Sequence, residues 1–291
     1  MIERYYEEVA PGYGQRFTVD TVLCDIQTEH QHLMIFDHCH FGRVMVLDGI
    51  LQSTRQDEFI YHEMMAHVPL FAHGHAKRVL IIGGGDGGTL REVLRHKTST
   101  QVTLVEIDGL LLDACREYLP QHHRGAFEDP RTRLLIQDGI RFVKESAESF
   151  DVIIIDSTDP VGPGKVLFTE AFYAACRRCL APGGVLVTQN GVAFFQLEEV
   201  TSTARSLSRV FEDFGFYSAA VPTYIGGIMA FGWASDDPGL RAISPDILKT
   251  RYAAAGISTG YYTPHIHRAA FVLPRYVQAA IDTKSGFIST F

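Results

Sequence analysis

The sequence predicts an α/β protein, in which a doubly wound parallel sheet follows a small antiparallel β domain. Residues 78–88, RVLIIGGGDGG, indicate a buried strand that is followed directly by a glycine-rich turn. This pattern is typical of a parallel strand whose nucleotide-binding loop leads into a helix. Strands and helices alternate after about residue 55, whereas only strand-like runs precede it. We therefore expect two domains, residues 1–55 and residues 56–291.

Four strand-like runs predict the first domain. They are QRFTVDTVLCDI, HLMIFD, GRVMVL and ILQST, and Asp48-Gly49 joins the last two, which is a strong signal for a tight hairpin. From Thr54 the pattern becomes helical, because Asp57 follows three residues later as in a capping box and an apolar stripe comes next. The stripe consists of Ile60, Met64, Val68 and Phe71.

The second domain alternates regularly. Its expected strands are RVLIIG, QVTLVEI, RLLIQ, DVIIID and GGVLVTQN, with helices near residues 89–95, 110–118, 140–145 and 170–180. A helix near residues 198–214, the strand-like runs FYSAAVPT and GGIMAFGWA, and a helix opened by Ser244-Pro245 follow. This alternation predicts ligand binding at the carboxyl ends of the strands.

Composition and charge limit the classes of function. The 291 residues include 26 Lys and Arg against 34 Asp and Glu, a net charge of -8, which disfavours nucleic acid as a partner and is compatible with a cationic ligand. No secretory pattern or membrane-length apolar run occurs, so we expect a cytoplasmic protein without a membrane partner. The five cysteines are expected to be reduced thiols, and neither the Cys176/Cys179 pair nor the histidine pairs predict a metal site.

Glycines and acidic strand ends indicate a nucleoside pocket. The glycines of residues 83–88 fit the G-x-G-x-x-G pattern, which alone would equally fit an NAD enzyme. Glu106 ends the second strand, where it can accept both ribose hydroxyls. Asp138-Gly139 ends the next strand, where nucleoside methyltransferases hold an adenine amino group. These positions favour an S-adenosyl compound over NAD.

Further carboxylates indicate a cationic second ligand. Asp156 leaves a strongly apolar strand, Asp159 follows within one turn, and Asp86 lies in the glycine-rich turn. At an effective dielectric near 20, each ammonium–carboxylate contact at 4 Å contributes about 4 kcal/mol before desolvation. A polyamine fits such a site. The Pro- and Gly-rich residues 160–164 predict a lid over it, within residues 157–168.

Taken together, these segments resemble the polyamine aminopropyltransferase family, and within it the bacterial spermidine synthases. The match runs over nearly the whole chain, and the combination of motifs is highly specific. The motifs are LDG at 47–49, DEFIYHEM at 57–64, GGGDGG at 83–88, VEID at 105–108, EDPR at 128–131, DG at 138–139, DSTDPVGP at 156–163, LFT at 167–169, and PTY with GG at 222–227. The resemblance implies a Rossmann-like sheet of the class I AdoMet-dependent methyltransferase type and a homodimer, built through the N-terminal strands.

The resemblance also implies roles for individual residues. The residues that look like contacts to decarboxylated S-adenosylmethionine, or to its product methylthioadenosine, are Gln31, Glu106, Asp138, Gly139 and Pro163. Those that look like diamine contacts are His62, Asp86, Asp156 and Asp159, with Asp156 as the proton acceptor and Tyr61, Gln189 and Tyr224 as supports for the amine. No cofactor is implied, because the adenosyl donor is a co-substrate.

The expected reaction transfers an aminopropyl group to putrescine and gives spermidine and methylthioadenosine. The chain departs from the family pattern at two places: Tyr5 or Tyr6 stands where many members carry a tryptophan, and His62 stands where glutamine is frequent. Cadaverine, agmatine and spermidine therefore stay open as acceptors. An AdoMet-dependent methyltransferase acting on a small amine, and a polyamine-binding sensor on the same fold, are the alternative functions.

Overall fold

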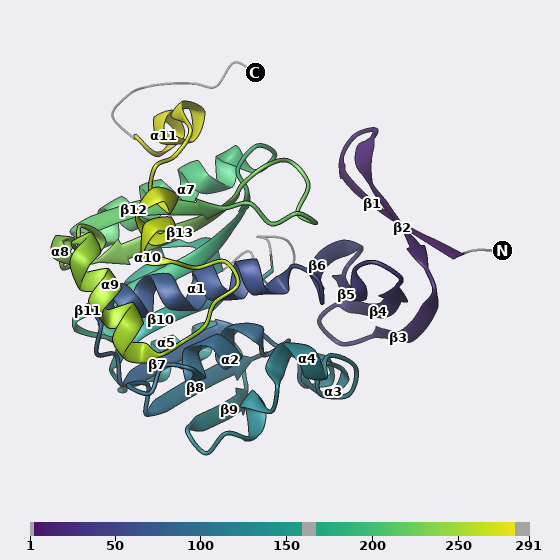
Figure 1. Cartoon of the computed structure of the whole chain (residues 1–291), viewed down its shortest axis with the longest axis horizontal. Coiled ribbons are helices and arrows are strands. Elements are labelled where there is room, and N and C mark those ends of the chain that lie inside the picture. The colour runs from purple at the N-terminus through teal and green to yellow at the C-terminus, as the bar shows by residue number, and fades with distance from the viewer. Residues whose placement is uncertain (1–2, 159–166, 283–291) are drawn as a thin grey trace.

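The computed structural model describes residues 3–158 and 167–282, and it separates a small β region from a larger layered region (Figure 1). The β region holds β1 (Glu3–Ala10) paired with β2 (Tyr13–Val19), and a second antiparallel sheet of β3 (Thr21–Gln27), β4 (His32–His38), β5 (Gly42–Leu47) and β6 (Ile50–Thr54). Consecutive strands pair within each sheet, as short hairpin connections require. The predicted antiparallel β domain is confirmed.

The hairpin at Asp48-Gly49 forms as predicted between β5 and β6. Asp48 has φ +48° and Gly49 has φ +78°, and a tight two-residue turn needs both in the left-handed region. Two details differ from the expectation. The run QRFTVDTVLCDI is broken at Asp20 into β2 and β3, which belong to different sheets. Strand β1 was not predicted, because its charged residues conceal a strand pattern.

The larger region is built on a sheet whose described strands follow the order β12-β13-β11-β10-β7-β8-β9. The strands are β7 (Arg78–Gly83), β8 (Gln101–Glu106), β9 (Thr132–Ile136), β10 (Phe150–Asp156), β11 (Leu180–Val192), β12 (Asp213–Ala219) and β13 (Met229–Ser235). Strands β7 to β11 are parallel, whereas β13 runs antiparallel to both of its neighbours. The segment 220–228 between β12 and β13 is too short for a crossover, so it makes a hairpin.

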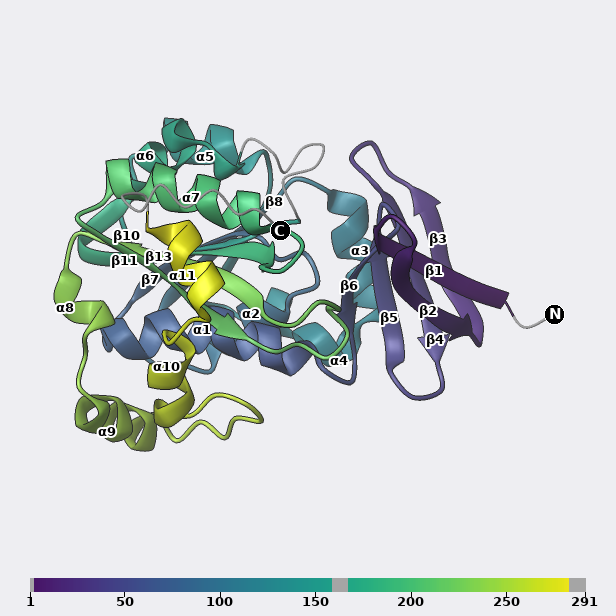
Figure 2. The same cartoon turned by 90° about the horizontal axis from the view of Figure 1, so that it is seen from above.

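Helices cover both faces of this sheet, which confirms the doubly wound arrangement (Figure 2). Along β7, Val79 and Ile81 pack with α1 (Glu58–His73) and α2 (Gly88–Leu94) on one face. Leu80 and Ile82 pack with α5 (Gly139–Glu145), α6 (Glu170–Arg178) and α7 (Leu197–Val210) on the other. The remaining helices are α3 (Gly109–Tyr118), α4 (Pro120–His123), α8 (Pro238–Arg241), α9 (Pro245–Ala255), α10 (Pro264–Ala270), α11 (Arg275–Ile281) and a 3₁₀ turn (Ala126–Glu128).

Helix α1 connects the two regions and is almost wholly buried. Its predicted apolar stripe lies in the core, but the capping box does not form: the helix begins at Glu58, and Asp57 makes no side-chain capping bond. The carboxylate of Asp57 instead accepts hydrogen bonds from the Thr54 hydroxyl and from Thr223. This distant partner could not be inferred from local spacing.

Two other features bear on the expectations from sequence. Ser244 caps α9 as predicted, since its hydroxyl accepts the Ile247 N–H. The short helices α4, α8, α10 and α11 were not predicted, because helices of four to seven residues give little periodicity of their own. The helices α2 and α5 are as short as α10 and α11, but their places between successive predicted strands indicated them. Within the two described ranges, no helix has both the length and the apolar character needed to cross a membrane.

Candidate active site

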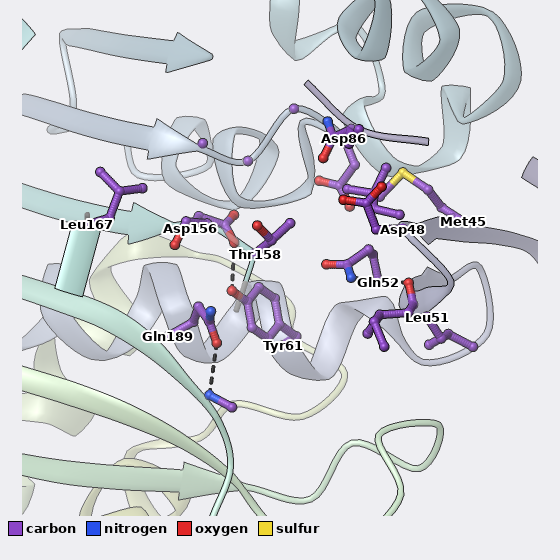
Figure 3. Close-up of a pocket in the computed structure, with 18 of the residues that line it drawn as sticks. Met45, Asp48, Leu51, Gln52, Tyr61, Asp86, Asp156, Thr158, Leu167 and Gln189 are labelled. Atoms are coloured by element: carbon purple, nitrogen blue, oxygen red, sulfur yellow. Dashed lines mark hydrogen bonds between the residues drawn. The ribbon is translucent and has the colours of Figure 1, made fainter. Parts of the chain in front are cut away.

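A cavity of about 550 Å³ opens at the carboxyl ends of β7, β8 and β10, where the β region meets the layered region (Figure 3). Its walls bring together ten of the residues predicted from sequence, namely Gln31, Tyr61, His62, Asp86, Glu106, Asp138, Gly139, Asp156, Gln189 and Tyr224. Asp159, Pro163 and most of the predicted lid lie outside the described residues. The cavity therefore unites residues from both regions at the sheet edge that the strand alternation indicated.

The glycine-rich turn makes room for the acidic side chains around it. Gly83 and Gly84 have φ +83° and +71°, and the Gly84 N–H donates to the backbone oxygen of Asp156 at 2.7 Å. A Cβ at Gly83 would lie 2.1 Å from that oxygen, and one at Gly84 would lie 2.9 Å from Asp156 Oδ2. A Cβ at Gly88 would similarly meet the His62 ring at 2.2 Å. The absence of side chains at these glycines thus leaves the space that Asp156 and His62 occupy.

Glu106 and Asp138 lie on neighbouring strand ends of the cavity. Glu106 is buried and its Oε1 accepts the Asp108 N–H at 3.0 Å. Burial raises the pKa of Glu106 to about 7, with the charges of Asp108 and Asp156 acting in the same direction and backbone N–H donors opposing them. Asp138 Oδ1 caps α5 by accepting the Ile140 N–H, which leaves Oδ2 free of the cap.

Asp156 ends β10 and faces Tyr61 from α1. The Tyr61 hydroxyl donates to Asp156 Oδ1 at 2.6 Å, as the dashed line in Figure 3 marks. Burial raises the pKa of Asp156 above its ordinary value, and the Asp86 charge adds to this, whereas His62 and the Tyr61 hydroxyl oppose it. Burial also holds the pKa of Tyr61 well above its usual range, so Tyr61 stays a phenol. Asp156 is thus a stronger base than an exposed aspartate.

A chain of alternating charges leads from Asp86 into the core. Asp86 Oδ1 accepts the Gly88 N–H at 2.9 Å, and His62 Nε2 lies 3.3 Å from Asp86 Oδ2. His62 Nδ1 contacts Glu58 Oε2 at 2.5 Å, and Arg91 holds both oxygens of Glu58 at 2.9 Å.

Both ring nitrogens of His62 therefore face carboxylates. Burial alone would lower the pKa of His62, but Asp86 and Glu58 raise it to about 10. The same pairing holds the pKa of Asp86 well below its usual range, although burial acts in the opposite direction. At neutral pH His62 is therefore a buried cation, and Asp86 is an anion at the cavity wall.

Gln189 and Tyr224 complete the wall opposite Asp86. Gln189 Oε1 accepts the Gly191 N–H at 2.9 Å, and its Nε2 is buried with no hydrogen-bond partner within the described ranges (Figure 3). The Tyr224 hydroxyl donates to the backbone oxygen of Gln52 in β6. Its ring centre lies 6.1 Å from that of Tyr61. The β region thus holds Tyr224 beside Tyr61.

Five residues near the cavity were not singled out as site residues from sequence: Thr28, Asp57, Glu58, Arg91 and Asp108. Asp108 carried a usable signal, because it stands two residues after Glu106 in VEID. The others act through partners far away in sequence; Arg91, for example, follows Glu58 by 33 positions. Local patterns hold no information on such pairs.

Family models match both parts of the chain. The model described as "Spermine/spermidine synthase domain" matches residues 58–242, and "Spermidine synthase tetramerisation domain" matches residues 3–55. The chain belongs to the spermine/spermidine synthase family. The resemblance noted from the motifs is confirmed, and so is the enzyme class: the chain is a polyamine aminopropyltransferase.

Relatives and solved structures of the family match nearly the whole chain. "Polyamine aminopropyltransferase 1" of Pseudomonas aeruginosa is 59% identical over 282 residues, covering 97% of this chain and 99% of its own. "Polyamine aminopropyltransferase" of Escherichia coli K12 is 56% identical, covering 97% and 98%.

Two solved structures confirm the fold. A spermidine synthase in complex with the transition state analogue AdoDATO aligns with a TM-score of 0.91 at 38% identity, covering 96% of this chain and 94% of that one. The spermidine synthase of Thermotoga maritima aligns with a TM-score of 0.88 at 37% identity, with the same coverage. The predicted Rossmann-like fold with its N-terminal β domain is therefore confirmed.

Proposed function

We propose that this aminopropyltransferase uses decarboxylated S-adenosylmethionine as donor and putrescine as acceptor, giving spermidine and methylthioadenosine. One observation carries the proposal: the base Asp156, bonded to Tyr61, shares a single cavity with the buried anion Asp86 and with the ribose-binding candidate Glu106. A nucleoside can thus lie at one end of the cavity with an amine at the other.

The charge of the cavity supports cationic substrates. Its described lining has seven acidic residues and neither lysine nor arginine; the acidic residues are Glu7, Glu8, Asp48, Asp86, Glu106, Asp138 and Asp156. Diamines and the decarboxylated donor are cations at neutral pH. Such a lining raises their local concentration and disfavours anionic ligands.

At the nucleoside end, we assign the ribose hydroxyls to Glu106 and Gln31 and the adenine amino group to Asp138. Each of these side chains has an oxygen that can accept a hydrogen bond from the nucleoside. Gly139 lies beside Asp138, where a Cβ would meet Ile82 at 2.4 Å. The contacts proposed for Asp159 and Pro163 stay predictions, because these residues lie outside the described ranges.

At the acceptor end, the reaction needs a neutral amine in line with the aminopropyl carbon. An alkylamine with a pKa near 10.4 is protonated at pH 7, and removing that proton costs roughly 4 to 5 kcal/mol. We assign the proton to Asp156, while the Tyr61 and Tyr224 oxygens and Gln189 orient the nitrogen. The nitrogen lone pair then forms the new C–N bond, and the C–S bond breaks as its electrons return to sulfur.

We assign Asp86 to an ammonium group, either that of the donor's aminopropyl arm or the distal one of the diamine. His62, expected from the resemblance to be a diamine contact, is a cation with both nitrogens engaged, so it has no lone pair for an ammonium. Its proposed part is to keep Asp86 ionised and in place.

Several further expectations belong to this proposal. The sulfonium is already an activated leaving group, so we propose that neither a metal, a cofactor nor a covalent intermediate takes part. The division at residues 1–55 and 56–291 and the cytoplasmic location stay predictions. Self-association through the N-terminal strands is proposed too, and the name of the matching N-terminal model favours four chains over the homodimer expected first.

Product analysis by mass spectrometry tests the function. The enzyme is incubated separately with decarboxylated S-adenosylmethionine and with AdoMet, each combined with putrescine, cadaverine, agmatine or spermidine. We expect spermidine and methylthioadenosine from the decarboxylated donor with putrescine at the highest rate. Faster turnover of another amine would change the acceptor, and a methylated amine formed from AdoMet would contradict aminopropyl transfer.

A further inference from the structure

Asp108 joins the two regions beside the nucleoside end of the cavity. It is only 2% exposed and lies between β8 and α3. Asp108 Oδ1 accepts the N–H groups of Leu110 at 3.1 Å and Leu111 at 3.2 Å, which caps α3. Asp108 Oδ2 accepts the Thr28 hydroxyl at 2.7 Å and Gln31 Nε2 at 3.0 Å. One carboxylate therefore ties a helix of the layered region to a turn of the β region.

The turn that carries Gln31 is closed on itself. The Thr28 hydroxyl oxygen accepts the N–H groups of His30 and Gln31, each at 3.0 Å. The Thr28 N–H donates to the Gln31 backbone oxygen at 2.9 Å. Because Thr28 is itself bonded to Asp108, both the backbone and the side chain of Gln31 are fixed relative to α3.

The contact with Asp108 decides which end of the Gln31 amide meets a ligand. A carboxylate oxygen that receives hydrogen bonds can face the amide nitrogen but not the amide oxygen. Gln31 Nε2 is therefore directed to Asp108, and Oε1 lies on the opposite side of the planar amide. Gln31 lines the same cavity as Glu106, whose Oε1 accepts the N–H of Asp108 itself.

We propose that Asp108 is a positioning residue that turns the oxygen of the Gln31 amide, and not its nitrogen, toward the ribose of the adenosyl donor. Gln31 and Glu106 then offer acceptors to the two ribose hydroxyls, which both donate. The inference deepens the proposed function and rests on it. The β region then takes part in nucleoside recognition through Gln31, and Asp108 orients Gln31 without contacting the substrate itself.

Asp108→Asn separates this role from helix capping. Asparagine is as good a cap as aspartate, so α3 keeps its N-terminus. The new amide group would place N–H donors against Gln31 Nε2, and the Gln31 amide would then turn its own nitrogen toward the ribose. The matched control is Asp113→Asn, on the same helix but with a side chain 72% exposed.

Calorimetry with methylthioadenosine and its 2′-deoxy and 3′-deoxy forms measures the effect. In the wild type we expect loss of the hydroxyl that faces Gln31 to weaken binding about three- to tenfold, the range of one neutral hydrogen bond. Asp108→Asn should bring that ratio close to one, while Asp113→Asn leaves it unchanged. Equal weakening of all three ligands by Asp108→Asn would mean that Asp108 only supports the fold, and would overturn the inference.

A double variant gives a test by rescue. In Asp108→Asn/Gln31→Glu, the amide introduced at position 108 donates to the carboxylate introduced at position 31, whose other oxygen again faces the ribose. Discrimination between the parent nucleoside and its deoxy form should return; failure to return contradicts the inference.

Gln31→Met decides the question if Asp108→Asn does not fold, because it removes the amide and keeps the cap. Gln31→Met should bind methylthioadenosine and its deoxy form with nearly equal affinity. If it distinguishes the two as strongly as the wild type does, the inference is overturned. A wild-type enzyme that binds methylthioadenosine without distinguishing the deoxy forms also overturns it. A wild-type enzyme that does not bind methylthioadenosine contradicts the proposed function itself.

Discussion

Glu106 ends β8 and Asp156 ends β10, the two strands that flank β7 in the sheet. Burial raises the pKa of both carboxyl groups, but their surroundings differ. Glu106 faces backbone N–H groups and suits hydroxyl donors, whereas Asp156 faces the Tyr61 hydroxyl and the charged pair of His62 and Asp86. Equivalent positions on two strands therefore have different chemistry, which matches their proposed partners, a neutral sugar for Glu106 and a reacting amine for Asp156.

Replacing Asp156 by asparagine tests the base. The change keeps the shape of the side chain but removes its ability to take a proton, so we expect kcat to fall at least ~100-fold. Methylthioadenosine affinity should stay within about twofold of the wild type, since Asp156 is assigned to the amine. Steady-state kinetics with saturating putrescine, together with calorimetry, measure both quantities. Turnover near that of the wild type would exclude Asp156 as the proton acceptor.

The raised pKa of Glu106 predicts a pH dependence of donor binding. With a pKa of about 7 in the free enzyme, the carboxyl group gains a proton as the pH falls below 7 and loses an acceptor for the ribose. Methylthioadenosine affinity should therefore fall by up to about tenfold per pH unit below 7 and level off above it.

The variant Glu106→Gln serves as the control for that profile. It should bind methylthioadenosine about 1 to 3 kcal/mol more weakly at pH 8, the range for hydrogen bonds to a charged group. Its affinity should be nearly flat between pH 5 and 8, because position 106 no longer titrates. Calorimetry that finds the same slope in both proteins would assign the titration to another group.

At the scale of elements, α1 places functional side chains on several of its faces. Tyr61 reaches Asp156 and His62 reaches Asp86, while Glu63 accepts the N–H groups of Gly260, Tyr261 and Tyr262. The helix therefore connects the cavity with the C-terminal segment. Its burial on all sides explains why a simple apolar stripe described only part of it.

Sequence periodicity identified β7, β8 and β10 because their buried residues form continuous apolar runs that end in glycine or an acid. The same reading found β9, which has no buried residue, from the short apolar run RLLIQ before Asp138-Gly139. It therefore found Glu106, Asp138 and Asp156 at the correct sheet edge. It missed the direction of β13 and the partners of Asp57, since both depend on contacts between distant segments: Asp57 and Thr223 are 166 residues apart. The acidic residues at the strand ends of the site could be predicted from the sequence. The distant side chains that hold the site residues in place could not.

Asp57→Asn tests one of these distant contacts. Asp57 Oδ2 accepts the Thr223 N–H at 2.9 Å and its hydroxyl at 2.7 Å, which anchors the residue next to Tyr224. An amide group in that place opposes the Thr223 N–H, so we expect the putrescine KM to rise about 5- to 30-fold, equivalent to roughly 1 to 2 kcal/mol.

Methylthioadenosine affinity should be unchanged in Asp57→Asn, because the contact lies at the acceptor end. The exposed Asp246→Asn on α9 is the control for a general loss of charge, since its side chain is 93% exposed. A nucleoside affinity that falls together with the putrescine affinity would indicate a global change of fold and not a local one.

At the scale of the whole molecule, negative charge is spread unevenly. The net charge is -8, and the cavity carries acidic residues from both regions with no lysine or arginine in its described lining. Arg91 lies behind the wall, where it compensates Glu58, and the cation His62 is held between two carboxylates. Around the cavity, anionic side chains thus outnumber cations, and the nearest cations, His62 and Arg91, are paired with carboxylates.

This arrangement predicts that charge selects the donor. AdoMet carries an α-carboxylate at the end of the arm that we place toward Asp86, where it meets like charge, whereas the decarboxylated donor brings only an ammonium. The wild type should bind the decarboxylated donor at least tenfold more tightly than AdoMet, about 1.4 kcal/mol. Asp86→Asn should reduce the preference for the decarboxylated donor over AdoMet and raise the putrescine KM. The variant removes the negative charge that repels the α-carboxylate and attracts ammonium groups, and it leaves the positive charge of His62 with only Glu58 as a partner.

Binding isotherms for both donors at fixed low salt measure the ratio, with Glu8→Gln as the matched control. Glu8 also lines the cavity, but it is exposed and its carboxylate accepts the Gly12 N–H at its own turn. Removing its charge changes the net charge of the protein by the same amount without touching the place assigned to the donor arm. If both variants narrow the ratio equally, selection comes from the general field of the cavity. If Asp86→Asn leaves the ratio unchanged, the donor arm does not point at Asp86.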